Sequence, residues 1–170
     1  FEVQNSNESK YSISVVTPSY NQVQFFNECL DSVFDQTLQP IEQLVLDPGS
    51  NDGSLNVARN YKHVTLINEP DDGQGDAVAK GISMAKGDII AWVNSDDSYF
   101  DNEVFATIVA SFSDEEDIIY GNGVFMAADG SKIRDVYINK DPSSLSWRFQ
   151  QEDGILQPAL FFKKSGFSTI

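Results

Sequence analysis

Short apolar segments alternate with helix-forming segments between residues 13 and 112 of this 170-residue chain, and this alternation limits the folds open to it. The predicted strands are apolar and four to six residues long: 13–17, 43–46, 64–67 and 88–93. A predicted helix follows each of them: 24–36, 54–61, 76–85 and 103–112. Strands that alternate with helices form a parallel sheet with helices on both faces. The pattern therefore predicts a doubly wound α/β fold.

The pattern changes after Asp117, where strand-like segments follow one another without long helices. These segments are 118–120, 123–126, 133–138 and 160–162. Asp129-Gly130 is typical of a hairpin turn, and residues 139–154 are predicted to be a loop with a short helical piece at 145–149. We therefore expect a mostly parallel sheet with a mixed β segment toward the C-terminus. A polar tail (1–10) should precede a single domain (11–170).

Composition excludes several classes of partner and site. Eleven basic and 26 acidic residues give a net charge of −15, whereas nucleic acids and anionic membranes need a basic surface. Cys29 is the only cysteine and lies among phenylalanines at helical spacing, which indicates a core thiol. The single histidine, His63, lies between a helix and a strand and is expected at the surface, so a zinc site is disfavoured. No apolar run approaches the ~20 residues of a transmembrane helix.

The fourth apolar strand ends in Asn94-Ser95-Asp96-Asp97, and this end carries the strongest chemical signal. Two adjacent carboxylates repel each other, and burying them is costly unless a cation compensates. Hard oxygen ligands suit Mg²⁺ or Mn²⁺, which also bind diphosphate oxygens. The alternative is an acidic N-cap for the next helix, but Asp101 lies closer to that helix. We interpret the pair as a divalent-metal site for a phosphorylated substrate.

Polar clusters follow all four strands, at 18–21, 47–53, 69–76 and 94–97. The carboxyl ends of parallel strands lie at one edge of the sheet, so these clusters should meet at one cleft. Tyr20 could stack on a nucleotide base or could simply be a packing aromatic. Asp47 could accept a hydrogen bond from a base or a ribose. Neither a G-x-x-x-x-G-K-S/T loop nor a G-x-G-x-x-G turn is present, which disfavours P-loop NTPases and ordinary dinucleotide dehydrogenases.

Five segments together resemble the family 2 glycosyltransferases in order and spacing: 15–22, 32–37, 47–53, 69–74 and 87–97. The resemblance covers roughly residues 12–166. It implies the GT-A fold and inverting transfer of a sugar from a nucleotide diphosphate donor, most often UDP-type, to an acceptor hydroxyl with Mg²⁺ or Mn²⁺. The acceptor would be a carbohydrate or glycolipid in cell-surface synthesis. The protein would then be cytoplasmic or peripheral at the membrane.

The resemblance also implies roles for particular residues. Ser95-Asp96-Asp97 is similar to the DxD-type motif of the family, in which Asp97 would ligate the metal and Asp96 would contact the ribose or sugar. The remaining implied donor-binding residues are Pro18 and Tyr20 and Asn21 beside the nucleotide, Asp47 at the base or ribose, Asp76 beside the sugar or ribose, and Asn94 and Ser95 next to the acidic pair. Gln157 would face the acceptor side.

Inverting transfer also needs a carboxylate that takes the acceptor's proton. In the family it usually follows the last strand, so we expect it beyond Ile170, in a domain truncated on its acceptor side. Glu152 and Asp153 are candidates within the chain, but Gly154 and a strand-like stretch follow them, which favours a loop. The alternative function is a non-catalytic nucleotide-sugar binding module. A nucleotidyltransferase is disfavoured, since the glycine- and arginine-rich loop of that class is missing.

Overall fold

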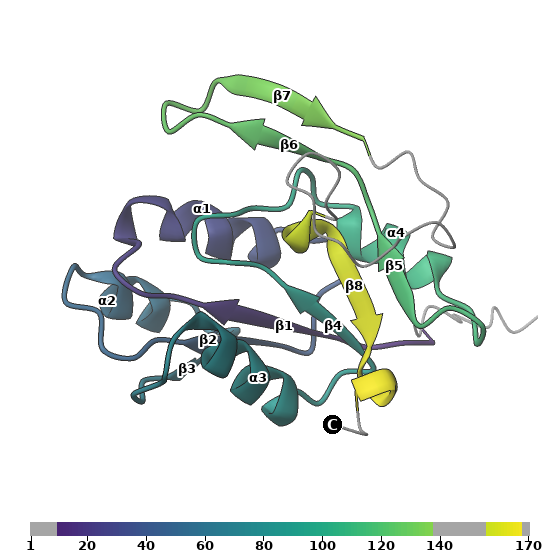
Figure 1. Cartoon of the computed structure of the whole chain (residues 1–170), viewed down its shortest axis with the longest axis horizontal. Helices are drawn as coiled ribbons and strands as arrows, with labels where there is room; N and C mark the ends of the chain where they lie inside the picture. The colour runs from purple at the N-terminus through teal and green to yellow at the C-terminus, as the bar shows by residue number, and fades with distance from the viewer. Residues whose placement is uncertain (1–9, 138–155, 168–170) are drawn as a thin grey trace, which may run out of the picture.

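The computed structural model describes residues 10–137 and 156–167, and a six-stranded sheet forms its centre (Figure 1). The strand order is β3-β2-β1-β4-β8-β5. The bounds are β1 Ile13–Pro18, β2 Glu42–Leu46, β3 Val64–Ile67, β4 Ile89–Trp92, β5 Ile118–Tyr120 and β8 Leu160–Lys163. Strands β1 to β4 pair in parallel, whereas β8 runs antiparallel to both β4 and β5. The predicted α/β class, parallel with a mixed C-terminal part, is confirmed.

Helices cover both faces of the sheet, as Figure 1 shows. Their bounds are α1 Val23–Phe34, α2 Ser54–Arg59, α3 Gln74–Met84 and α4 Val104–Ser111. Side chains alternate along a strand, so Val15 packs with Phe26 of α1 and Phe105 of α4, while neighbouring Val16 packs with Ala77 of α3 on the opposite face. Two apolar cores result, one on each side. Cys29 is buried in the first, as expected, and burial raises the pKa of its thiol.

Strands β6 (Gly123–Met126) and β7 (Lys132–Val136) form a separate antiparallel hairpin above the main sheet (Figure 1). The predicted turn at Asp129-Gly130 is present, with Gly130 at φ +81° and Ala127 N–H donating to the Ser131 carbonyl at 2.8 Å. A 3₁₀ turn, η2 (Gln157–Ala159), leads into β8, and a second, η3 (Lys164–Phe167), follows it. The tail 1–9, the predicted helical piece at 145–149, Glu152 and Asp153 lie outside the described residues.

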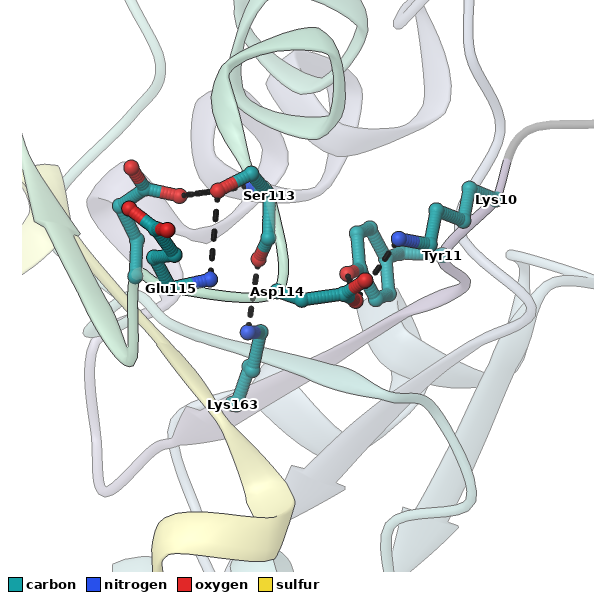
Figure 2. A network of polar contacts seen from close by, with 7 residues as sticks. Lys10, Tyr11, Ser113, Asp114, Glu115 and Lys163 are labelled. Atoms are coloured by element: carbon teal, nitrogen blue, oxygen red, sulfur yellow. Dashed lines mark hydrogen bonds and ion pairs between the residues drawn. The ribbon is translucent and has the colours of Figure 1, made fainter.

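A surface network joins the amino end of β1 to the end of β8 through the loop that follows α4 (Figure 2). Lys10 and the Tyr11 hydroxyl both bind the Asp114 carboxylate, at 2.7 and 2.9 Å. Lys163 donates to the Ser113 carbonyl at 2.8 Å. Since Lys163 pairs with Ile89, the first residue of β4, this network lies at the sheet edge opposite the carboxyl ends. Exposed pairs of this kind contribute little free energy.

A chain of polar side chains connects β1, β2 and the residue before β3. Gln43 Nε2 lies 3.0 Å from Thr17 Oγ1, and Gln43 Oε1 lies 2.9 Å from His63 Nε2. His63 is half-buried between the rings of Phe34 and Tyr61, so the expectation of a surface histidine was only partly right. Its Nδ1 is buried and has no hydrogen-bond partner among the described residues. Burial lowers the pKa of His63 below its usual value of 6.5.

This environment predicts a pH-dependent loss of stability. Because the folded-state pKa of His63 is lowered, its contribution is complete above pH 6.5 and is lost as the pH falls toward the folded-state pKa. His63→Gln, which cannot titrate, should lose less free energy of unfolding between pH 7 and 5.5 than the wild type, by less than about 1 kcal/mol after solvent screening. Urea unfolding at both pH values measures the difference, and equal losses would contradict the prediction.

Candidate functional site

The main cleft lies at the carboxyl ends of the parallel strands and has a volume of about 640 Å³. Its walls come from all four loops that the sequence placed at this edge. The lining residues are Pro18, Ser19, Tyr20, Gln22, Leu46, Pro48, Pro70, Asp71, Gly73, Gln74, Ala77, Asn94, Ser95 and Asp96. Of the predicted donor-binding residues, Pro18, Tyr20, Asn94, Ser95 and Asp96 therefore line one cleft. Asn21, Asp47, Asp76, Asp97 and Gln157 do not line it.

The Asp47 carboxylate holds its own loop together. It is 1% exposed, and Oδ1 accepts from the backbone N–H groups of Gly49 and Ser50 at 2.9 and 2.6 Å. Oδ2 accepts from the Ser50 hydroxyl at 2.7 Å. Pro48, directly after Asp47, is thereby fixed in the cleft wall. A direct contact between Asp47 and a base or ribose stays a prediction.

Asn21 joins the first loop to the second. Its backbone, at φ 54°, donates to Ser50 Oγ at 2.8 Å, and its Oδ1 accepts from Asn51 N–H at 3.0 Å. The next residues start α1, whose Val23 N–H donates to Asp52 Oδ2 at 2.8 Å. Asn21 and Asp52 thus connect the loops after β1 and β2 through hydrogen bonds. Tyr20, directly before Asn21, lines the cleft and is 61% exposed.

The start of α3 forms another part of the cleft wall. Gly73, at φ +109°, precedes the helix, and Gln74 is its first residue. The helix begins two residues earlier than the sequence indicated, so Asp76 lies within its first turn. The exposed Asp76 carboxylate accepts from Asp72 N–H at 3.2 Å. The helix N-terminus beside the cleft provides the partial positive charge that favours anionic ligands.

The Asn94 carboxamide is the polar centre of the cleft wall that follows β4. Its Oδ1 accepts from Gln74 Nε2 at 2.7 Å and from Trp92 Nε1 at 3.0 Å. Its Nδ2 donates to Asp97 Oδ2 at 3.2 Å and to Gln157 Oε1 at 2.7 Å. Gln157 Nε2 in turn donates to the Trp92 carbonyl. Gln157, predicted on the acceptor side, thus contacts the strand end that carries the acidic pair.

The two acidic residues differ in their surroundings. Asp96 is exposed in the cleft wall, and Asp97 is half-buried behind it. Burial raises the pKa of the Asp97 carboxyl above its ordinary value, the neighbouring Asp96 raises it further, and the Asn94 hydrogen bond acts in the opposite direction. A carboxylate that is costly to ionise on its own is one that a cation would stabilise. A cation beside Asp97 would therefore favour the ionised form of this carboxylate.

The described residues contain no group of three or more His, Cys, Asp or Glu side chains that could bind a metal by themselves. Mg²⁺ is, however, often held by one or two carboxylates together with substrate phosphates. Asp97, with Asp96 beside it, fits this smaller ligand set. The described part of the chain also has no helix long and apolar enough to cross a membrane.

Sequence reasoning missed Gln74 and Trp92 as site residues. Gln74 was expected in a turn before the third helix, and Trp92 within a buried strand. Both are found because their side chains donate to Asn94. The sequence contains only a weak signal for Trp92. Its indole can only donate a hydrogen bond, and Asn94 follows two residues later, so both side chains are expected on the same side of the chain.

The model of the family described as "Glycosyl transferase family 2" matches residues 14–167. The chain is 31% identical over 134 residues to an uncharacterized glycosyltransferase of Rickettsia felis, covering 76% of this chain and 22% of that protein. It is 30% identical over 118 residues to the uncharacterized glycosyltransferase YibD of Escherichia coli, covering 67% and 34%. The chain thus spans about a fifth to a third of the length of these curated relatives.

Solved structures with a similar fold include S. aureus TarS 1–349 in complex with UDP-GlcNAc, with a TM-score of 0.66 and 21% identity over 91% of this chain and 46% of that one. The mannosyltransferase PcManGT of Pyrobaculum calidifontis, in complex with GDP-Man and Mn²⁺, has a TM-score of 0.59 and 21% identity, covering 65% and 35%. At such identities the likeness shows a common fold, the expected GT-A fold.

Proposed function

The chain belongs to glycosyl transferase family 2, and from this premise we propose that its cleft binds a nucleotide diphosphate-sugar, UDP-type in the first instance, for inverting transfer to an acceptor hydroxyl. The observation that carries the proposal is the convergence of four loops on one cleft of about 640 Å³, with Asp96 in its wall. The proposed acceptor is a carbohydrate or glycolipid, as in the synthesis of cell-surface polysaccharides.

Different parts of the cleft wall suit different parts of such a donor. Tyr20 presents an exposed ring beside Pro18, which suits stacking of the base. The N-terminus of α3, beginning at Gln74, suits the diphosphate. Asp96, in the part of the wall that follows β4, suits the hydroxyls of the ribose or the sugar. Relatives support this choice of ligand, since the structures of TarS and PcManGT contain UDP-GlcNAc and GDP-Man.

Asp97 is the proposed ligand of Mg²⁺ or Mn²⁺. When bound there, the metal supplies positive charge against the diphosphate as it leaves the sugar. Asp97 and Asp96 would orient the donor so that its anomeric carbon faces the acceptor. Inverting transfer also needs a carboxylate that accepts the proton of the attacking hydroxyl, and we assign that role to no described residue.

Calorimetry with UDP and GDP, each with Mn²⁺ and with EDTA, tests the proposal. We expect one nucleotide to bind more tightly than the other, with an affinity that falls in EDTA. Failure of both nucleotides to bind, or equal affinity with and without metal, would contradict it. Incubation with the matching nucleotide sugar then separates catalysis from binding. Binding without transfer or donor hydrolysis in the full-length protein would favour the non-catalytic module instead.

A further inference from the structure

We propose that Gln157 is a positioning residue that fixes the Asn94 carboxamide and, through it, the metal-binding carboxylate of Asp97. The proposal rests on the donor site proposed above. It assigns Gln157 a function within the chain's own hydrogen-bond network rather than a contact with substrate. The two residues lie 63 positions apart in the sequence and are joined by one hydrogen bond of 2.7 Å.

The direction of every hydrogen bond in this network follows from Trp92. Its indole N–H can only donate, so the group 3.0 Å away on Asn94 must be the oxygen Oδ1. Its backbone carbonyl can only accept, so the Gln157 atom beside it must be Nε2. Gln157 therefore presents its oxygen to Asn94, and Asn94 must present its nitrogen to both Gln157 and Asp97. Neither amide can be reversed without placing like groups against each other.

All hydrogen-bonding capacity of the Asn94 carboxamide is used in this arrangement. Two lone pairs accept from Gln74 and Trp92, and two N–H groups donate to Asp97 and Gln157. The amide donates to Asp97 Oδ2. Among the described residues, no hydrogen bond is made to Asp97 Oδ1, so that oxygen remains available to a cation. Partners that orient a ligating carboxylate commonly change metal affinity 10- to 100-fold when removed.

The network also explains why β8 matters at the cleft. Gln157 lies in η2, directly before β8, and β8 pairs with β4 from Ile89 to Ala91. This pairing sets Gln157 beside the end of β4, where Asn94 leaves the strand. The hydrogen bond from Gln74 to Asn94 connects the same network to the start of α3. A shift of β8 would therefore alter the position of the Asp97 carboxylate through two hydrogen bonds, from Asn94 to Gln157 and from Asn94 to Asp97.

The test compares Gln157→Ala and Gln157→Glu with the wild type and with Gln39→Ala, a control at an exposed glutamine before the amino end of β2 that does not line the cleft. UDP and GDP affinities are measured with Mn²⁺ and with EDTA. We expect both Gln157 variants to reduce the Mn²⁺-dependent gain in affinity about 10-fold while leaving the affinity in EDTA unchanged. Glutamate has the size of glutamine, but its carboxylate would place an oxygen acceptor against the Trp92 carbonyl. Gln157→Glu should therefore lose Mn²⁺-dependent affinity as Gln157→Ala does. Wild-type behaviour of Gln157→Glu would overturn the proposal, because it would indicate a purely steric role.

A measurement without nucleotide separates this proposal from the proposed function. In the ligand-free protein, the side-chain amide ¹⁵N–¹H signals of Asn94 should shift and exchange faster with water in Gln157→Ala, and remain unchanged in Gln39→Ala. Unchanged Asn94 signals in Gln157→Ala would overturn the positioning role, whatever the nucleotide results. If the wild type binds neither UDP nor GDP, the proposed function fails, and the role in metal binding fails with it.

Discussion

Asp97→Ala should abolish the Mn²⁺-dependent part of nucleotide diphosphate binding, a loss of at least about 100-fold in affinity, while binding in EDTA stays at the wild-type level. The reason is the ligand set: the segment after β4 offers one half-buried carboxylate, Asp97, with one exposed neighbour, Asp96, so the loss of Asp97 leaves little there to hold a cation. Calorimetry with UDP and GDP, with and without Mn²⁺, measures both affinities.

Two further variants sharpen this prediction. Asp35→Ala removes a carboxylate at the end of α1, far from the cleft, and should change neither affinity. Asp97→Asn removes the charge whose burial raises the pKa of Asp97. Because the native state holds the Asp97 proton more tightly than the unfolded state, this residue destabilises the fold as the pH rises above its usual pKa. The metal-free Asp97→Asn protein should therefore be at least as stable as the wild type at pH 7. Retention of Mn²⁺-dependent binding by Asp97→Ala would refute the metal assignment.

Phe105→Ala should reduce the free energy of unfolding by about 3–5 kcal/mol, the largest stability effect that we predict. Phe105 is fully buried in α4, and its ring lies 4.9 Å from that of Tyr99 and 6.4 Å from that of Phe161 in β8. The truncation leaves a cavity between the acidic loop, α4 and β8. Since native proteins are stable by only about 5–15 kcal/mol, a large part of the total would be lost.

Phe100→Ala is the matched control for this experiment. The substitution is the same and lies five residues away, but the Phe100 side chain is 86% exposed. We expect a change within about 0.5 kcal/mol there. Urea unfolding followed by fluorescence measures both variants. Equal losses from the two changes, or a loss below about 1 kcal/mol for Phe105→Ala, would show that the aromatic cluster around Tyr99 does not support the fold as described.

Local patterns were enough to predict most elements near the cleft. The apolar strand before Asn94 and the clusters after the other three strands indicated a common edge, and residues from all four clusters line the cleft. Family membership and the α/β fold were confirmed. The assigned contacts of Tyr20, Asp96 and Asp97 with a donor stay predictions. The interpretation of Asp47 omitted its hydrogen bonds to Gly49 and Ser50, because a carboxylate after a strand looks the same in the sequence whether it binds a ligand or its own loop.

The parallel part of the sheet and its acidic edge could be predicted from the sequence, because hydrophobic periodicity and strand-ending polar residues are local signals. The position of β8, antiparallel between β4 and β5, and the resulting contact of Gln157 with Asn94 became visible only in the folded chain. The sequence of a four-residue strand does not indicate which strand it will pair with, since pairing depends on which strand edges the rest of the fold leaves free. The contact between Gln157 and the acidic strand end is a consequence of that pairing, and so only the folded chain could reveal it.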